Sequence, residues 1–206
     1  MPGLFISFEG GEGVGKTTQI AALSAALGSQ GRSVVTTREP GGTPLGAIVR
    51  TLILSPESVV SPRAEALLYA ADRAHHVDTV IEPALAEGKV VISDRYVDST
   101  LAYQGAGRSL RLTDILTLSK FATADRWPDL TILLDADPRL GLARARGAGA
   151  GDRIEAESLR FHQQVRAAFL DLAAEFANRF VVIDASSSIG QIQTEVLAAV
   201  TDRLIG

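Results

Sequence analysis

The chain has 206 residues, of which 46% are apolar and 21% charged, and its net charge is −4. This composition supports a sizeable hydrophobic core and excludes a disordered or collagen-like chain, while the length suits one domain of about 100–200 residues. The negative charge argues against a nucleic acid as partner. The absence of cysteine excludes disulfides, thiolate nucleophiles and cysteine-bound metals.

Signals for a metal or a membrane are also few. There are three histidines and no His-Glu-x-x-His spacing, so oxygen atoms must hold any divalent ion, which indicates Mg²⁺ or none. No apolar stretch approaches the ~18 residues of a membrane span, and the N-terminus becomes acidic and glycine-rich too early for a secretory signal. We therefore expect a cytoplasmic protein without a membrane partner. All but three of the 20 basic residues are arginines, whose planar guanidinium suits bidentate contact with phosphate.

Short apolar runs alternate along the chain with longer amphipathic stretches. The runs predict buried strands at Leu4–Phe8, Ser33–Thr37, Lys89–Ser93, Leu130–Leu134 and Phe180–Ile183. The amphipathic stretches predict helices at Lys16–Gln30, Leu45–Leu54, Ala64–Glu87, Leu112–Ala124, Pro138–Arg146, Ile154–Asn178 and Ile189–Leu204. Pro83 lacks a backbone donor and should kink or split the helix that contains it. The alternation predicts an α/β fold, a five-stranded parallel sheet with helices on both faces, in one domain over residues 1–206.

A glycine-rich motif lies between the first predicted strand and the first predicted helix. It fits the pattern G-x-x-x-x-G-K-[ST], in which the backbone amides and the helix N-terminus cradle a pyrophosphate. Lys16 should reach the β- and γ-phosphates, and the Thr17 hydroxyl should ligate Mg²⁺. The motif predicts a P-loop fold with a nucleoside triphosphate held by Gly10, Gly11, Glu12, Gly13, Val14, Gly15, Lys16, Thr17 and Thr18. A regulatory GTPase is disfavoured because no Asn-Lys-x-Asp is present, and a motor ATPase because little room is left for a coupling domain.

Two further features bear on the chemistry. Predicted strands end in Asp94 and Asp135, either of which could place a carboxylate near a magnesium ion, and spacing alone does not choose between them. The glycine-rich run Gly147–Gly151 has arginines on both sides, at Arg144, Arg146 and Arg153. This run is either a mobile cationic flap or a plain connector.

The order of four segments resembles that in thymidylate kinases, P-loop nucleoside monophosphate kinases, and in particular the bacterial type. These segments are Glu9–Thr18, Thr37–Thr43, Asp94–Tyr96 and Asp152–Glu155, and the resemblance extends from Leu4 to Ile183. It implies transfer of the ATP γ-phosphoryl group to dTMP, giving dTDP and ADP, for dTTP synthesis. It also implies Mg²⁺, held by Thr17 and Asp94, and a homodimer, for which the helix over Ala64–Glu87 could supply a surface.

The resemblance further implies roles for individual residues. Arg38 and Arg95 would hold the 5′-phosphate of dTMP, while Tyr69 would stack on thymine and Arg73 would hydrogen-bond to it. The whole set implied for dTMP is Glu12, Arg38, Tyr69, Arg73, Arg95, Thr100, Tyr103 and Gln104. The residues implied to stabilise the transferred phosphate are Lys16 and Arg95, with Arg144, Arg146 and Arg153 of a short lid at roughly 144–155.

Two alternatives remain open from the sequence. One keeps the kinase chemistry but takes another nucleoside monophosphate, or a nucleoside, as acceptor. The other is a nucleotide-dependent interaction module without catalysis. A panel of acceptors distinguishes all three, because only a kinase releases ADP in response to its acceptor.

Overall fold

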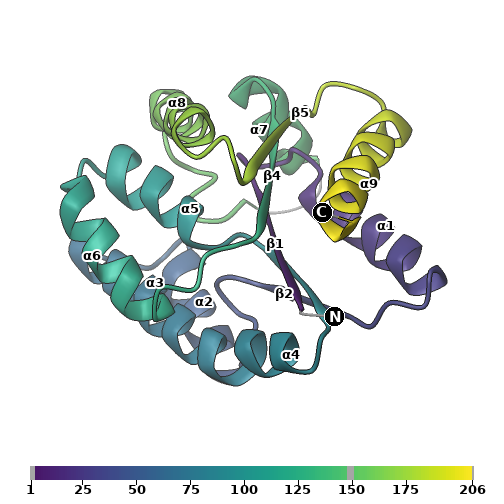
Figure 1. Ribbon diagram of the computed structural model, residues 1–206. Helices are drawn as coiled ribbons and strands as arrows, with labels where there is room; N and C mark the ends of the chain where they lie inside the picture. The colour runs from purple at the N-terminus through teal and green to yellow at the C-terminus, as the bar shows by residue number, and fades with distance from the viewer. Residues whose placement is uncertain (1–2, 148–150, 206) are drawn as a thin grey trace.

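The computed structural model describes residues 3–147 and 151–205, and at its centre lies a twisted parallel sheet (Figure 1). The sheet has five strands in the order β2-β3-β1-β4-β5, and every neighbouring pair is parallel. Its strands are β1 (Leu4–Glu9), β2 (Val34–Arg38), β3 (Val90–Asp94), β4 (Leu130–Asp135) and β5 (Phe180–Asp184). The predicted α/β class and the positions of all five predicted strands are thereby confirmed. The predicted burial is wrong for β2, in which no residue is fully buried, and for most of β5, because these strands form the two edges of the sheet.

Helical segments follow each strand, and those after β1, β2, β3 and β4 return the chain to the start of the next strand. They are α1 (Lys16–Ser29), α2 (Pro44–Leu54), α3 (Pro62–His76), the π-helical turn η1 (Val77–Ile81), α4 (Glu82–Ala86), α5 (Val97–Thr100), the π-helical segment η2 (Leu101–Gly107), α6 (Leu112–Thr123), α7 (Pro138–Arg146), α8 (Leu159–Glu175) and α9 (Ile189–Ile205). Among the described residues, none of these helices combines the length and the apolar content that a membrane span requires.

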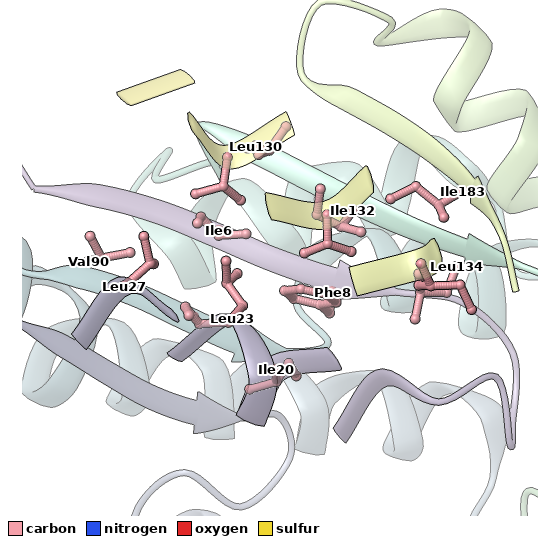
Figure 2. Close-up of a cluster of buried hydrophobic side chains, with 14 of the residues drawn as sticks. Ile6, Phe8, Ile20, Leu23, Leu27, Val90, Leu130, Ile132, Leu134 and Ile183 are labelled. Atoms are coloured by element: carbon pink, nitrogen blue, oxygen red, sulfur yellow. The ribbon is translucent and has the colours of Figure 1, made fainter. Parts of the chain in front are cut away.

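One face of the sheet packs against α1 and α9. Alternate residues of β1, Ile6 and Phe8, are fully buried there against Leu23 and Leu27 of α1. Val196 and Val200 of α9 close the same cluster, whose sheet and α1 side chains are drawn in Figure 2. This burial fixes the direction of α1, and therefore the position of the loop that precedes it.

The opposite face is covered by η1 and α4, which pack against β1 and β3, and by α8, which packs against β4 and β5. The helical segments α3, η2 and α6 belong to the cluster around α8. Phe161, Val165 and Phe169 of α8 pack there against Tyr103 of η2. With helices on both faces, the fold has the three layers that the sequence predicts.

A buried arginine lies at the opposite end of the sheet from the glycine-rich motif. Arg179 donates from both terminal nitrogens to the Asp98 carboxylate, at 2.7 Å each. Its guanidinium also lies 5.3 Å from the ring centre of Trp127 and 5.0 and 4.7 Å from those of Phe176 and Phe180. This cluster fastens α5 to the beginning of β5.

Two predicted helices need correction. The helix predicted over Ala64–Glu87 begins at Pro62 and is interrupted by η1, just before Pro83, so the proline does split it as expected. The helix predicted over Ile154–Asn178 begins only at Leu159, because Ser158 caps it by accepting a hydrogen bond from the amide of Phe161 at 3.3 Å. In addition, the helical segment formed by α5 and η2 was not predicted at all.

Candidate active site

The loop between β1 and α1 depends on glycine at its bends. Gly10, Gly13 and Gly15 have φ values of 133°, 64° and 94°, in the region that favours glycine. A Cβ on Gly10 would lie 2.3 Å from the carbonyl oxygen of Leu134, and a Cβ on Gly13 would lie 2.0 Å from that of Gly141. The loop is therefore pressed against β4 and α7, and it presents the N-terminus of α1, which attracts an anion.

Lys16 closes this loop from the first position of α1. Its Nζ donates to the carbonyl oxygens of Gly10 at 3.2 Å and of Gly11 at 2.9 Å. Burial and the nearby Arg95 guanidinium lower the pKa of Lys16. The ammonium group is thus held over the loop, where it faces the same cleft as Thr17 and Thr18.

Of the two acids at strand ends, Asp94 lies beside the loop. The Thr17 hydroxyl donates to Asp94 Oδ2 at 3.4 Å, and Asp94 Oδ1 is buried with no hydrogen-bond partner among the described residues. Asp135 instead binds both Nε and Nη2 of Arg166, each at 2.7 Å. Asp94 therefore has free ligand capacity next to Thr17, while the oxygens of Asp135 are occupied by an arginine.

Arg95 adopts a backbone conformation that is uncommon for an arginine. Its φ is 70°, a left-handed conformation that costs about 1–3 kcal/mol and persists only where surrounding contacts impose it. Here its amide donates to the Phe8 carbonyl at 2.9 Å, and its carbonyl accepts from the Ser93 hydroxyl at 2.7 Å. The turn directs the side chain at the phosphate loop, where Nη1 donates to the Gly10 carbonyl at 2.9 Å.

Glu12 lies within the loop and joins it to two predicted site residues. Its Oε1 accepts from Arg95 Nη2 at 2.7 Å and from the Tyr103 hydroxyl at 2.8 Å. Burial disfavours the charged form of Glu12, but Arg95, Lys16 and the hydrogen bond from Tyr103 outweigh it and lower its pKa to about 2. Arg95 thus pairs with Glu12 and not with Asp94.

Arg73 is fully buried and is held in a single orientation. Nε donates to Glu39 at 2.7 Å, Nη1 to the Thr100 hydroxyl at 3.0 Å and Nη2 to the Tyr96 carbonyl at 3.1 Å. Burial alone would lower the pKa of Arg73, but the Glu39 carboxylate outweighs it and raises that pKa. Gln104 is also fixed, because its Nε2 donates to the buried Glu65 at 2.8 Å.

The predicted lid arginines occupy different surroundings. Arg144 and Arg146 are both exposed, on α7. Arg144 lines the cleft beside the loop and donates to the Ala185 carbonyl at 3.0 Å, whereas Arg146 is the last residue of the helix. Arg153 is paired with Glu65 and donates to the Ile53 carbonyl at 2.8 Å. Residues 148–150 of the predicted lid lie outside the described part of the chain. In this conformation, Arg144 is the predicted lid arginine that lines the same cleft as the loop.

Two adjoining clefts gather these side chains. The phosphate cleft, of about 1050 Å³, is lined by residues 12–18 of the loop with Arg38, Asp94, Arg95 and Arg144. The acceptor cleft, of about 510 Å³, contains every residue predicted for dTMP except Arg38, namely Glu12, Tyr69, Arg73, Arg95, Thr100, Tyr103 and Gln104. Glu12 and Arg95 line both clefts, so the two clefts meet at these residues.

Three further residues, Glu39, Arg50 and Asp152, line both clefts and were not predicted as site residues. Arg50 of α2 donates to the Pro40 carbonyl at 3.1 Å, and Glu39 pairs with Arg73. Arg50 belongs to an ordinary amphipathic helix, so nothing local distinguishes it. Glu39 lies in the segment Thr37–Thr43 that carries the resemblance, and its position beside the glycine turn is the one signal that could have indicated it.

Comparison with known proteins gives one consistent answer. A family model described as Thymidylate kinase matches residues 8–196. A thymidylate kinase of Leifsonia xyli is 54% identical over 98% of this chain and 97% of its own length. Those of Deinococcus radiodurans and Halothermothrix orenii are 50% and 48% identical, covering 98% and 100% of this chain and the same shares of their own. The matched residues include the loop, the strand ends and the helices that form both clefts, and the chain belongs to the thymidylate kinase family.

Proposed function

We propose that the protein transfers the γ-phosphoryl group of ATP to the 5′-phosphate of dTMP, giving dTDP and ADP, as a step toward dTTP. The observation that carries this proposal is the junction of the two clefts at Glu12 and Arg95. A triphosphate on the loop and a nucleotide in the acceptor cleft would meet end to end there. Family membership supports the choice of ATP and dTMP.

In the proposed reaction an oxygen of the acceptor 5′-phosphate attacks the γ-phosphorus in line. The bond from that phosphorus to the β,γ-bridging oxygen breaks, and ADP leaves with the electron pair. The acceptor is already an anion, so neither a general base nor a covalent enzyme intermediate is required. The work of the protein is then to align two polyanions, exclude water and offset their charge.

The cations around the phosphate cleft supply that charge. Lys16 stands over the loop, while Arg38 and Arg95 approach from the ends of β2 and β3. Among the lid arginines, the position of Arg144 in the cleft supports a direct role for it. For Arg146 and Arg153 the same role requires that their side chains change position.

A magnesium ion fits between Thr17 and Asp94. Hydroxyl and carboxylate oxygens are the ligands that Mg²⁺ prefers, and the unpartnered Asp94 Oδ1 is a buried oxygen that such an ion would satisfy. The described residues hold no group of three or more His, Cys, Asp or Glu side chains that could bind a metal without help. The remaining ligands would come from ATP and water, and the bound ion would offset phosphate charge.

A panel of acceptors in an ADP-release assay tests the proposal. The panel contains dTMP, dUMP, UMP, CMP and thymidine, each offered with ATP and Mg²⁺. We expect dTMP to give the highest kcat/KM. Better use of UMP, CMP or thymidine would refute the assignment of the acceptor, and ATP binding without acceptor-dependent ADP release would indicate an interaction module.

We also propose that the chain is a single P-loop kinase domain with a lid at roughly 144–155, that it acts in the cytoplasm and that it forms a homodimer. Exposed apolar side chains on three adjacent helices support the dimer: Ile48 of α2 is 69% exposed, Leu67 of α3 58% and Phe121 of α6 87%. Sedimentation of wild type and Phe121→Glu tests it. We expect a dimer that the substitution weakens, and a monomeric wild type would refute it.

A further inference from the structure

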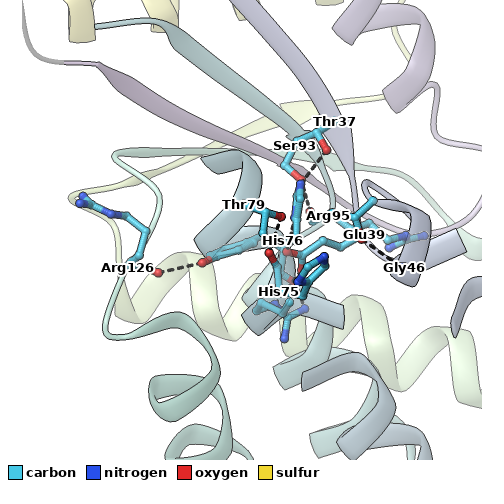
Figure 3. Close-up of polar contacts among 12 residues, drawn as sticks. Thr37, Glu39, Gly46, His75, His76, Thr79, Ser93, Arg95 and Arg126 are labelled. Atoms are coloured by element: carbon cyan, nitrogen blue, oxygen red, sulfur yellow. Dashed lines mark hydrogen bonds and ion pairs between the residues drawn. The ribbon is translucent and has the colours of Figure 1, made fainter. Parts of the chain in front are cut away.

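A chain of buried hydrogen bonds leads from β2 to Arg73. His76, the last residue of α3, approaches Glu39 Oε1 through Nδ1 at 2.8 Å and the Thr37 hydroxyl through Nε2 at 2.6 Å. Glu39 Oε2 in turn accepts from Arg73 Nε at 2.7 Å. Figure 3 shows the imidazole of His76 between Thr37 and Glu39, with Glu39 beside the turn that precedes α2.

The neighbouring backbone leaves room for this arrangement. A Cβ on Gly42 would lie 2.4 Å from Thr37 Oγ1 and 2.7 Å from His76 Nε2, so the loop passes over the imidazole at a position where a side chain would clash. His76 is fully buried, and the side chain of Glu39 is 2% exposed. A buried polar pair is stable only when its hydrogen bonds are satisfied.

The protonation of the ring follows from its partners. Glu39 is paired with the Arg73 guanidinium and is therefore a carboxylate, which can only accept. The proton between Glu39 and the ring must then be on Nδ1, and a neutral ring accepts the Thr37 proton at Nε2. Glu39 thus fixes the tautomer, and the Thr37 hydroxyl satisfies the second ring nitrogen. The ring occupies Oε1 of Glu39, while Oε2 accepts from Arg73.

The consequence concerns the donors of Arg73 that face the acceptor cleft. Glu39, Thr100 and the Tyr96 carbonyl each take one N–H, and an arginine has more donors than these partners use. The remaining N–H groups are oriented only as well as the guanidinium plane is held. Loss of the ring would free one oxygen of Glu39, let the carboxylate rotate and loosen Nε.

We propose that His76 is a positioning residue that acts through Glu39 to orient Arg73 for reading the acceptor base. The inference rests on the proposed function, in which Arg73 faces the base of a nucleotide. It assigns to Thr37 the role of holding the imidazole. It also gives a reason why the turn over the imidazole carries glycine at position 42.

Steady-state kinetics of matched variants test the proposal. His76→Leu keeps the approximate volume but removes both polar contacts, whereas the amide of His76→Asn can replace Nδ1 as the donor to Glu39. We expect His76→Leu to raise KM for dTMP about tenfold, with kcat and KM for ATP little changed. The reason is that the substitution removes a hydrogen bond to the charged Glu39, which orients Arg73 in the acceptor cleft. The preference for dTMP over dCMP should fall by a similar factor, and His76→Asn should recover most of both losses.

The control is His75→Leu, the same substitution at a half-buried neighbour whose ring has no part in the chain of hydrogen bonds; we expect wild-type kinetics. Thr37→Val is a milder variant, expected to shift KM for dTMP in the same direction even if His76→Leu does not fold.

Unchanged KM and base preference in both Thr37→Val and a folded position-76 variant would overturn the inference. So would an equal rise in KM for ATP, which indicates a general defect. Failure of the wild type to use dTMP would instead refute the proposed function, and the same variants would then be compared with the acceptor that it does use.

Discussion

The contact between the phosphate loop and α7 makes the effect of one methyl group calculable. Gly141 lies where a Cβ would stand 2.2 Å from the carbonyl oxygen of Glu12. A carbon and a carbonyl oxygen approach to about 3.3 Å at the closest, so Gly141→Ala must move α7 or the loop by roughly 1 Å. Arg144, less than one turn further along α7, would move with the helix. A misplacement of this size in a catalytic site costs about 10²-fold in rate, and overpacking costs about 1–3 kcal/mol in the free energy of unfolding.

The assay is kcat with saturating ATP and dTMP, together with urea unfolding of the same preparations. Gly190→Ala in α9 is the matched control, because nothing lies within 4 Å of a Cβ there. We expect Gly141→Ala to remain folded but to lose about 10²-fold in kcat, while Gly190→Ala keeps the wild-type rate. A kcat of Gly141→Ala within twofold of wild type would refute the idea that the loop fixes α7.

Two further predictions concern the lid and the dependence on pH. Arg144→Ala should lower kcat by about 10²-fold or more with little loss of stability. Arg153→Ala removes a partner of the buried Glu65 and should instead lower the free energy of unfolding by about 1–3 kcal/mol. The reverse result, from the same two assays, would make Arg153 the arginine that stabilises the transferred phosphate. Burial, with help from Asp98, raises the pKa of Glu9 to about 8, and burial with Glu39 raises that of Asp72 to about 6. Because the native state keeps protons that the unfolded chain has released above about pH 4.5, the free energy of unfolding should fall as pH rises from about 4.5 to 8. Urea titrations across this range should show Glu9→Gln reducing the decline, and a flat wild-type profile would contradict it.

The fold could be predicted because its most buried strands are visible in the sequence as short apolar runs. Every residue of β1 is buried, as is nearly all of β3 and β4, so each appears as an apolar run. The segment α5–η2 has no comparable pattern in the sequence. Most of its residues are buried whether polar or apolar, so no amphipathic period of 3.6 residues arises, and the helix was missed.

The candidate site, too, could be predicted only in part. The phosphate loop is local in sequence, so spacing alone predicts it. The surroundings of Arg73 are not local, because Glu39, Thr100 and the Tyr96 carbonyl come from segments that only the fold brings together. The pairing of Arg153 with Glu65 is hidden for the same reason, since these residues are 88 positions apart.

The aromatic cluster around Arg179 also gives the molecule an internal optical reporter. Trp127 is the one tryptophan in the chain, and its indole lies against this guanidinium, ahead of β4. Its fluorescence should change when the cluster comes apart. Each substitution considered above can therefore be checked for folding by emission, in the cuvette of the kinetic assay before substrates are added.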